Sequence, residues 1–182
     1  MFPRRPIKHC RECGAPVVYR IPDDGDTHTR AVCTRCNTIH YENPLMVVGT
    51  VPVLGDRVLL CKRAIEPRRG LWTLPAGFME LQETTAQGAA RETDEEAGAD
   101  IAMGPLFTLL NVTHVGQVHL FYRATLHSEH FNPGAETLEA RLFTEAEIPW
   151  EQMAFRTVSK TLECYFADRR AGSFGFHCID IS

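Results

Sequence analysis

The chain has 182 residues, of which 44% are hydrophobic and 23% charged, a composition typical of a globular protein with a sizeable core. Its formal net charge of −4 argues against a general nucleic-acid-binding protein, which should be basic. No apolar run approaches the roughly 20 residues that a membrane-spanning helix needs. The first residues also lack the apolar segment of a secretory signal. We therefore expect a cytoplasmic protein with no membrane partner.

Four of the seven cysteines lie near the start of the chain, as the pairs Cys10/Cys13 and Cys33/Cys36. Two CxxC pairs at this separation are typical of a zinc ribbon, in which each pair supplies two thiolates to a tetrahedral Zn²⁺ site. Short strands are expected at 17–21 and 29–32, on either side of a turn. Two disulfides are the alternative, but nothing in the sequence indicates secretion. Four thiolates leave no open coordination position, so the zinc should be structural or serve a dimer interface.

Pro44 marks the expected boundary between a zinc ribbon at 1–43 and a larger domain at 44–182. Within the larger domain, Pro52 predicts a bulge or an exposed edge in the first strand. Residues 172–181 should form a closing strand or tail, and a helix is expected at 149–170. Further strands are expected at 45–54, 58–63, 72–77, 102–112, 117–125 and 139–144. This mixture predicts an α/β or α+β domain.

The stretch from Gly77 to Ala99 is the most informative part of the chain. Thr84 and Gln87 have the spacing of a capping box, so a helix should begin near Thr84, and Gly98 is a plausible stop. At about 100° per residue, small residues occupy one arc of this helix, which should be buried. The opposite face carries three acids, which we expect to converge: Glu92, Glu95 and Glu96.

Three like charges at this spacing weaken a helix unless something neutralises them. Mg²⁺ prefers such oxygen ligands and keeps its other positions for water or substrate phosphates. An ordinary solvated acidic face is the alternative for an isolated charge run. The larger pattern favours a specific site, because seven positions are set: Gly77-x5-Glu83-x7-Arg91-Glu92-x2-Glu95-Glu96-x-Gly98.

This pattern resembles the Nudix box, the signature of hydrolases that cleave a nucleoside diphosphate linked to another moiety. The resemblance implies an α/β/α sandwich with a mixed sheet, in which Mg²⁺ or Mn²⁺ binds the three glutamates. It also implies that Gly77 offers its carbonyl to the metal, that Glu83 lies at the helix start, and that Arg91 orients a carboxylate. Thr93 stands where the family has an aliphatic residue; this should affect packing more than chemistry.

A zinc ribbon before a Nudix domain is the arrangement of NADH pyrophosphatases. Their SQPWPFP-type run is absent here, and the corresponding region is PLFTLLNVTHVGQVHLFY. Other segments more closely resemble the zinc-ribbon Nudix enzymes related to the plant chloroplast FAD pyrophosphatase: HYENPLMVVGTV, LLCKRAIEPRRGLWTLPAGFMEL and LEARLFTEAEIPWEQMAF. That resemblance implies FAD or ADP-ribose as the dinucleotide substrate, and a homodimer.

Several roles stay open. Arg63 and Arg69 belong to a basic patch that either grips substrate phosphates or is ordinary solvated charge. Glu136 and Glu139 are candidate general bases, besides Glu95 and Glu96, or plain surface acids. Three aromatic residues could stack on a base or fill the core: Phe78, Phe121 and Phe155.

Three alternative functions share much of this sequence evidence. An NADH pyrophosphatase or a nucleoside-triphosphate pyrophosphohydrolase would use the same catalytic residues with a different pocket. A regulator would sense a nucleotide and bind nucleic acid through the ribbon. The complete set of box carboxylates argues against the regulator, because regulatory Nudix domains usually lose some of them.

Overall fold

The computed structural model describes residues 6–181, which form two compact units; one ends at Pro44 and the other begins at Leu45. The first unit, called here the ribbon unit, is a three-stranded antiparallel sheet of β1 (Val17–Arg20), β2 (Arg30–Cys33) and β3 (Ile39–His40). The first two strands confirm the prediction. The third was not predicted, because two residues carry no periodicity and only pairing with β2 defines them.

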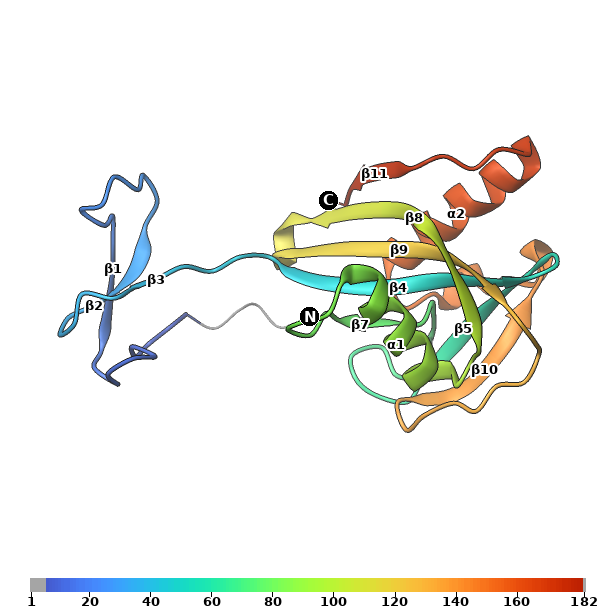
Figure 1. Ribbon diagram of the computed structural model, residues 1–182, viewed down its shortest axis with the longest axis horizontal. Coiled ribbons are helices and arrows are strands. Elements are labelled where there is room, and N and C mark those ends of the chain that lie inside the picture. The colour runs from blue at the N-terminus through green and yellow to red at the C-terminus, as the bar shows by residue number, and fades with distance from the viewer. Residues whose placement is uncertain (1–5, 182) are drawn as a thin grey trace. The chain divides into compact units, whose positions relative to one another are not determined.

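The larger unit is built on one mixed eight-stranded sheet in the order β10-β5-β4-β9-β8-β11 (Figure 1). Strands β4 and β9 pair in parallel, as do β8 and β11, and the other pairs are antiparallel. Two short strands complete the sheet: β6 (Trp72–Thr73) beside β5 and β7 (Ala76–Phe78) beside β4. The long path consists of β4 (Leu45–Leu54), β5 (Arg57–Arg63), β8 (Ile101–Val112), β9 (Gln117–Leu126), β10 (Thr137–Phe143) and β11 (His177–Asp180).

Helices α1 (Thr85–Ala97) and α2 (Arg156–Ala171) cover opposite faces of this sheet. Strand β5 shows the division, because its side chains alternate between the two faces. Leu59 packs in one core cluster with Ala97 of α1, whereas Leu60 packs in the other with Leu162 of α2. The mixed sheet between two helices confirms the expected α/β sandwich.

Pro52 was predicted to mark a bulge or an exposed edge, and this prediction was wrong. Pro52 is buried in β4, whose register with β9 runs without a shift. The backbone N–H of Thr50 points away from β9 to Pro75, and Pro52, two residues on, has the same orientation. On that side β4 pairs first with β7, through residues 47–49, and then with β5, through residues 53–54. The missing N–H therefore falls in the gap between the two partners.

The second helix begins later than predicted. Residues from Trp150 to Gln152 form a short 3₁₀ helix, and α2 itself starts at Arg156. The intervening segment is extended because it pairs with β6: Met153 bridges Trp72, and the Ala154 N–H donates to the Trp72 carbonyl at 2.8 Å. The remaining 3₁₀ turns are Thr113–Val115 and Glu145–Glu147.

Candidate active site

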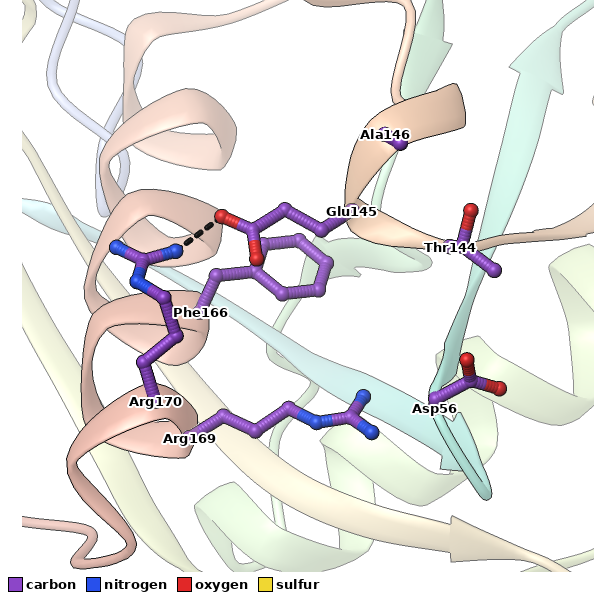
Figure 2. A pocket seen from close by; sticks show the side chains of 7 residues that line it. All are labelled: Asp56, Thr144, Glu145, Ala146, Phe166, Arg169 and Arg170. Atoms are coloured by element: carbon purple, nitrogen blue, oxygen red, sulfur yellow. Dashed lines mark hydrogen bonds and ion pairs between the residues drawn. The ribbon is translucent and has the colours of Figure 1, made fainter.

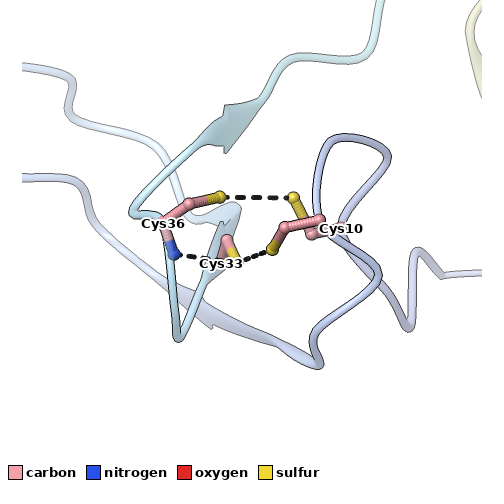
Figure 3. A group of neighbouring side chains, drawn as sticks. Cys10, Cys33 and Cys36 are labelled. Atoms are coloured by element: carbon pink, nitrogen blue, oxygen red, sulfur yellow. Dashed lines mark hydrogen bonds between the residues drawn. The ribbon is translucent and has the colours of Figure 1, made fainter.

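The four ribbon cysteines come together as the spacing predicts (Figure 3). The Cys10 and Cys36 sulfurs are 3.6 Å apart, and those of Cys13 and Cys33 are 3.4 Å apart. A disulfide has an S–S distance of about 2.05 Å, and all seven cysteines of the chain are free. A tetrahedral site with Zn–S bonds of about 2.3 Å requires sulfurs roughly 3.8 Å apart. The cluster therefore has the donors and the spacing of a structural zinc site.

Backbone geometry shapes the two CxxC turns, called here the cysteine knuckles, that form this cluster. The N–H groups of Glu12 and Arg35 donate to the sulfurs of Cys10 and Cys33, at 3.4 and 3.3 Å. Asn37, directly after the second pair, has a φ of 59°, a left-handed conformation that asparagine tolerates better than most residues. Such N–H···S bonds favour thiolates, the form that binds a metal.

In the larger unit, Arg91 is the centre of a carboxylate network around α1. Its guanidinium binds both oxygens of Glu83, at 3.1 and 2.8 Å. It also donates to Glu92 at 2.7 Å, to Glu95 at 3.1 Å and to the Phe78 carbonyl at 3.2 Å. The hydrogen bonds from Arg91 lower the pKa of Glu83 to about 2. Arg91 thus ties the preceding loop to the acidic face of the helix.

Glu92 and Glu96 are buried, each with only 9% of its surface exposed. Burial raises the pKa of Glu96 to about 7, although a hydrogen bond from the Ala76 N–H, 3.0 Å long, lowers it. Burial also raises the pKa of Glu92, against the lowering effect of Arg91. The protein therefore holds two carboxylates in a region where their negative charge is only partly compensated.

The prediction that three carboxylates converge on one face of α1 was only partly right. The Glu95 side chain is 58% exposed and turns to Arg91, whereas Glu92 and Glu96 point inward. Among residues 6–181, only the four cysteines bring three or more potential metal ligands within 4.8 Å of one another. The helical wheel missed this difference because the segment of Pro75 and strand β7 covers part of the acidic face and buries it.

Two glycines make room for carboxylates of this network. A Cβ atom on Gly77 would lie 2.3 Å from an oxygen of Glu92, and one on Gly88 would lie 2.6 Å from an oxygen of Glu83. Gly77 was predicted as a metal ligand through its carbonyl; the structure adds a steric reason for glycine there. Gly88 was not singled out, although a glycine inside a short helix is itself a signal of close packing.

Thr93 is fully buried, as expected for the position where an aliphatic residue was anticipated. Its hydroxyl donates to the Ala89 carbonyl at 2.8 Å and lies 2.6 Å from the hydroxyl of Thr50 in β4. The polar atom is therefore satisfied by a partner on the sheet, and the departure from the family pattern concerns packing.

A loop far along the sequence completes the surroundings of the acids. The Asn132 N–H donates to the Ala97 carbonyl at the end of α1. A Cβ on Gly134 would lie 2.2 Å from the Glu95 carbonyl, so loop and helix are in close contact. Glu136 follows two residues later with an exposed side chain, and its charge adds to the effect of burial, which is the main cause of the raised pKa of Glu92 and Glu96.

The other residues predicted for the site do not lie together. Glu139 lies in β10 opposite Lys62, with an exposed side chain. Arg63 ends β5 near the acids, and its charge lowers the pKa of Glu96, whereas Arg69 is exposed in the following loop. Phe121 belongs to the core. The Phe78 side chain is half exposed, and the Phe155 ring lies against Arg63.

A pocket of about 340 Å³ lies elsewhere, between the end of α2 and the segment after β10 (Figure 2). An ion pair between Arg170 and Glu145 spans one side of it. None of the residues that line it belongs to the acidic network, so it is separate from the candidate active site.

Comparison with known proteins assigns the class. The sequence profile of the NUDIX domain matches residues 44–162, and a profile described as Nudix N-terminal matches residues 8–42. The chain therefore belongs to the Nudix hydrolase family. No helix in the described part of the chain is long and apolar enough to cross a membrane.

Two proteins of known structure are similar to this chain. A NUDIX hydrolase of known crystal structure from Nitrosomonas europaea is 50% identical, with a TM-score of 0.92 over 96% of this chain and 99% of that one. An ADP-ribose pyrophosphatase from Streptococcus suis shares the fold at 21% identity, with a TM-score of 0.62 over 76% of this chain and 100% of that one.

Curated relatives carry a different name. The NAD-capped RNA hydrolase NudC of Photobacterium profundum is 27% identical over 143 residues, which are 77% of this chain and 51% of that protein. The same-named protein of Vibrio vulnificus is 28% identical over 64% of this chain and 45% of its own length. This chain spans about half the length of the curated relatives it matches.

Proposed function

We propose that the protein hydrolyses the pyrophosphate bond of a nucleoside diphosphate linked to a second moiety, with FAD and ADP-ribose as the first candidates. Cleavage of FAD would give FMN and AMP, and cleavage of ADP-ribose would give ribose phosphate and AMP. The observation that carries this proposal is the pair of buried carboxylates, Glu92 and Glu96, beside Gly77. A protein gains little from such charges unless a cation or substrate compensates them.

The donor set fits a hard divalent cation such as Mg²⁺ or Mn²⁺, because all the candidate ligands are oxygen atoms. Glu92 and Glu96, with Glu95 and the Gly77 carbonyl, would hold the metal. When bound, the cation would neutralise pyrophosphate oxygens and lower the pKa of a water molecule. In the ribbon unit, Cys10, Cys13, Cys33 and Cys36 would hold Zn²⁺ in a structural role.

The protein's own groups divide the remaining tasks. Arg91 orients Glu92 and Glu83, and the Ala76 N–H orients Glu96, so the carboxylates keep their positions before substrate arrives. Water attacks one phosphorus atom, the bridging P–O bond breaks, and the other phosphate leaves with the bridging oxygen. We propose that Glu136, which lies near the acids, is the general base that accepts the proton of the attacking water. Glu139 on β10 is the less favoured candidate.

Product analysis tests the reaction. The protein is incubated with FAD, ADP-ribose, NADH or nucleoside triphosphates, each with Mg²⁺ or Mn²⁺, and the products are separated by chromatography. We expect AMP and the second phosphomonoester, with loss of activity in Glu96→Gln. Pyrophosphate released from a triphosphate would instead identify a triphosphate pyrophosphohydrolase. If no substrate is cleaved with either metal, the catalytic proposal is wrong and the regulatory alternative takes its place.

NADH, or RNA capped with NAD, forms the second candidate substrate class. It is favoured by the relatives named NAD-capped RNA hydrolase, which keeps nucleic acid open as a partner. The missing SQPWPFP-type run counts against it. Parallel reactions with NADH and a short NAD-capped RNA decide between the classes: specificity constants at least tenfold above those for FAD and ADP-ribose would make it the principal activity.

The base assignment has its own test. Removing a positioned general base typically lowers the rate by about 10²–10⁴-fold. We therefore expect Glu136→Gln to lower kcat in this range, and the matched control Glu139→Gln to leave it within about twofold. Equal effects of the two substitutions would contradict the assignment.

A further inference from the structure

Arg63 is held from two sides at the end of β5. Its Nε atom donates to the Pro67 carbonyl at 2.9 Å, and its guanidinium carbon lies 5.2 Å from the centre of the Phe155 ring. Both groups belong to segments that are themselves anchored. The negative face of an aromatic ring attracts such a cation, and the attraction is stronger where water is excluded.

The loop that supplies Pro67 is closed by Arg63 itself. The Arg63 N–H donates to the Leu71 carbonyl, and the Gly70 N–H donates to the Arg63 carbonyl, each at 2.9 Å. The same residue thus closes the base of the loop with its backbone and binds its tip with its side chain.

Phe155 is anchored independently of this loop. The segment before it pairs with β6 through Met153 and Ala154, and Phe155 immediately precedes α2. Its ring is half-buried and packs against the core cluster to which α2 contributes. One face of the ring is occupied by Arg63, which argues against a role in stacking on a substrate base.

The free end of Arg63 is directed to the neighbourhood of the acids. Within residues 6–181, no hydrogen bond or ion pair reaches its Nη1 and Nη2 atoms. Arg63 pairs with Thr137 across the sheet, and the Ala64 N–H donates to the Glu136 carbonyl, so the end of β5 lies beside the loop that carries the proposed base. Arg63 lies two residues after Cys61 on the same face of β5, and the Cys61 sulfur is 4.0 Å from the Glu96 carbonyl, so this end of the strand lies beside the acids. The charge of Arg63 accordingly lowers the pKa of Glu96, against the larger effect of burial.

We propose that Phe155 is a positioning residue that, with the Pro67 carbonyl, holds the Arg63 guanidinium ready to bind a phosphate of the dinucleotide. This inference rests on the proposed function. A guanidinium presents two parallel N–H groups to phosphate, and holding it in place beforehand removes most of the ordering that binding would otherwise require. Phe155 acts only through Arg63 and does not touch the reacting atoms.

A double-mutant cycle separates this role from a merely structural one. The variants are Phe155→Leu, Phe155→Tyr, Arg63→Met and the double variant Phe155→Leu/Arg63→Met. The probe is a methylene-bridged analogue of ADP-ribose that cannot be cleaved, and its Kd is measured by calorimetry with Mg²⁺ present. KM and kcat for ADP-ribose are measured in parallel.

We expect Phe155→Leu to weaken binding of the analogue and to raise KM about three- to tenfold, with a smaller effect on kcat. Phe155→Tyr keeps the aromatic face, so Kd for the analogue and KM for ADP-ribose should stay at their wild-type values. In the Arg63→Met background, Phe155→Leu should have no further effect. An equal loss in both backgrounds, or no loss in either, would overturn the proposal.

Two controls keep the outcome interpretable. Phe174→Leu removes another aromatic ring under an arginine, Arg123 at 4.2 Å, in the segment after α2, and should leave Kd unchanged. If the protein cleaves no dinucleotide but the analogue binds with the predicted pattern, the hydrolytic proposal fails and the role of Phe155 stands. If the protein cleaves dinucleotides but the variants do not show the expected pattern of Kd and KM, only the proposed role of Phe155 is wrong.

Discussion

The two candidate metal sites of this molecule differ in how they are assembled. The ribbon cysteines lie on two short turns and already converge, with few buried residues around them. The glutamates of α1 lie against a large core, are held by Arg91 and the Ala76 N–H, and do not converge as a trio. A metal would thus be part of folding in the first site, whereas in the second it would join a structure that the core already supports.

The largest expected effect is that of zinc on the ribbon unit. Apparent binding energies of about 10–16 kcal/mol in zinc-finger peptides show that such small units are unfolded without metal. Cys33→Ser, or a strong chelator, should therefore unfold residues 8–42 and leave the larger unit folded. Amide NMR spectra and zinc content check this. Cys178→Ser, at an exposed cysteine, is the control, and a ribbon that stays folded without zinc would refute the contrast.

Arg91 tests how far the second site depends on protein contacts alone. Arg91→Met leaves three carboxylates without their shared cation, and removing one partner of a largely buried pair destabilises by about 3–5 kcal/mol. Urea denaturation with chelator present measures the loss. The control is Arg57→Met, which breaks the more exposed pair with Glu129 and should change stability by less than about 1 kcal/mol. Similar losses in both variants would contradict the role of Arg91.

Glu96 should make the stability of the metal-free protein depend on pH. Its pKa is about 7 in the folded protein and 4.5 as an isolated group, so the folded state binds more protons between these values. The favourable contribution is present below pH 4.5 and is lost as pH rises through 7. The loss is about 3 kcal/mol at about 1.4 kcal/mol per pKa unit.

The Glu96→Gln variant isolates this effect, because other titrating groups contribute to both proteins. The stability of the variant relative to wild type should rise between pH 5 and pH 8 by about 2.5 kcal/mol. Thermal or urea denaturation in chelator gives the difference at each pH. A difference that stays constant across this range would show that Glu96 titrates normally.

The smallest expected effect concerns the loop that closes on α1. Gly134→Ala forces a methyl group against the Glu95 carbonyl, and such overpacking costs about 1–3 kcal/mol. The control is Gly175→Ala, where the added methyl group has open space. Denaturation midpoints compare the two, and kcat should fall in the first variant only, because Glu136 moves with the loop.

The sequence alone determined the elements whose causes are local. The capping box at Thr84, the left-handed stop at Gly98 and the two cysteine knuckles depend on nearby residues, and the structure has them where predicted. The family pattern identified the class from one stretch of chain. Alternating and apolar runs located most of the long strands, because burial on a sheet imposes that period.

Tertiary structure alone decided the rest. Which acids of α1 are buried depends on strand β7, and the approach of the loop that carries Glu136 depends on Gly134, far along the chain. Pairing with β6 delays the start of α2 and thereby places Phe155 on Arg63. These contacts join segments that are distant in sequence, so no local pattern carries them. Local propensity specifies the elements, and long-range packing specifies which of their side chains meet.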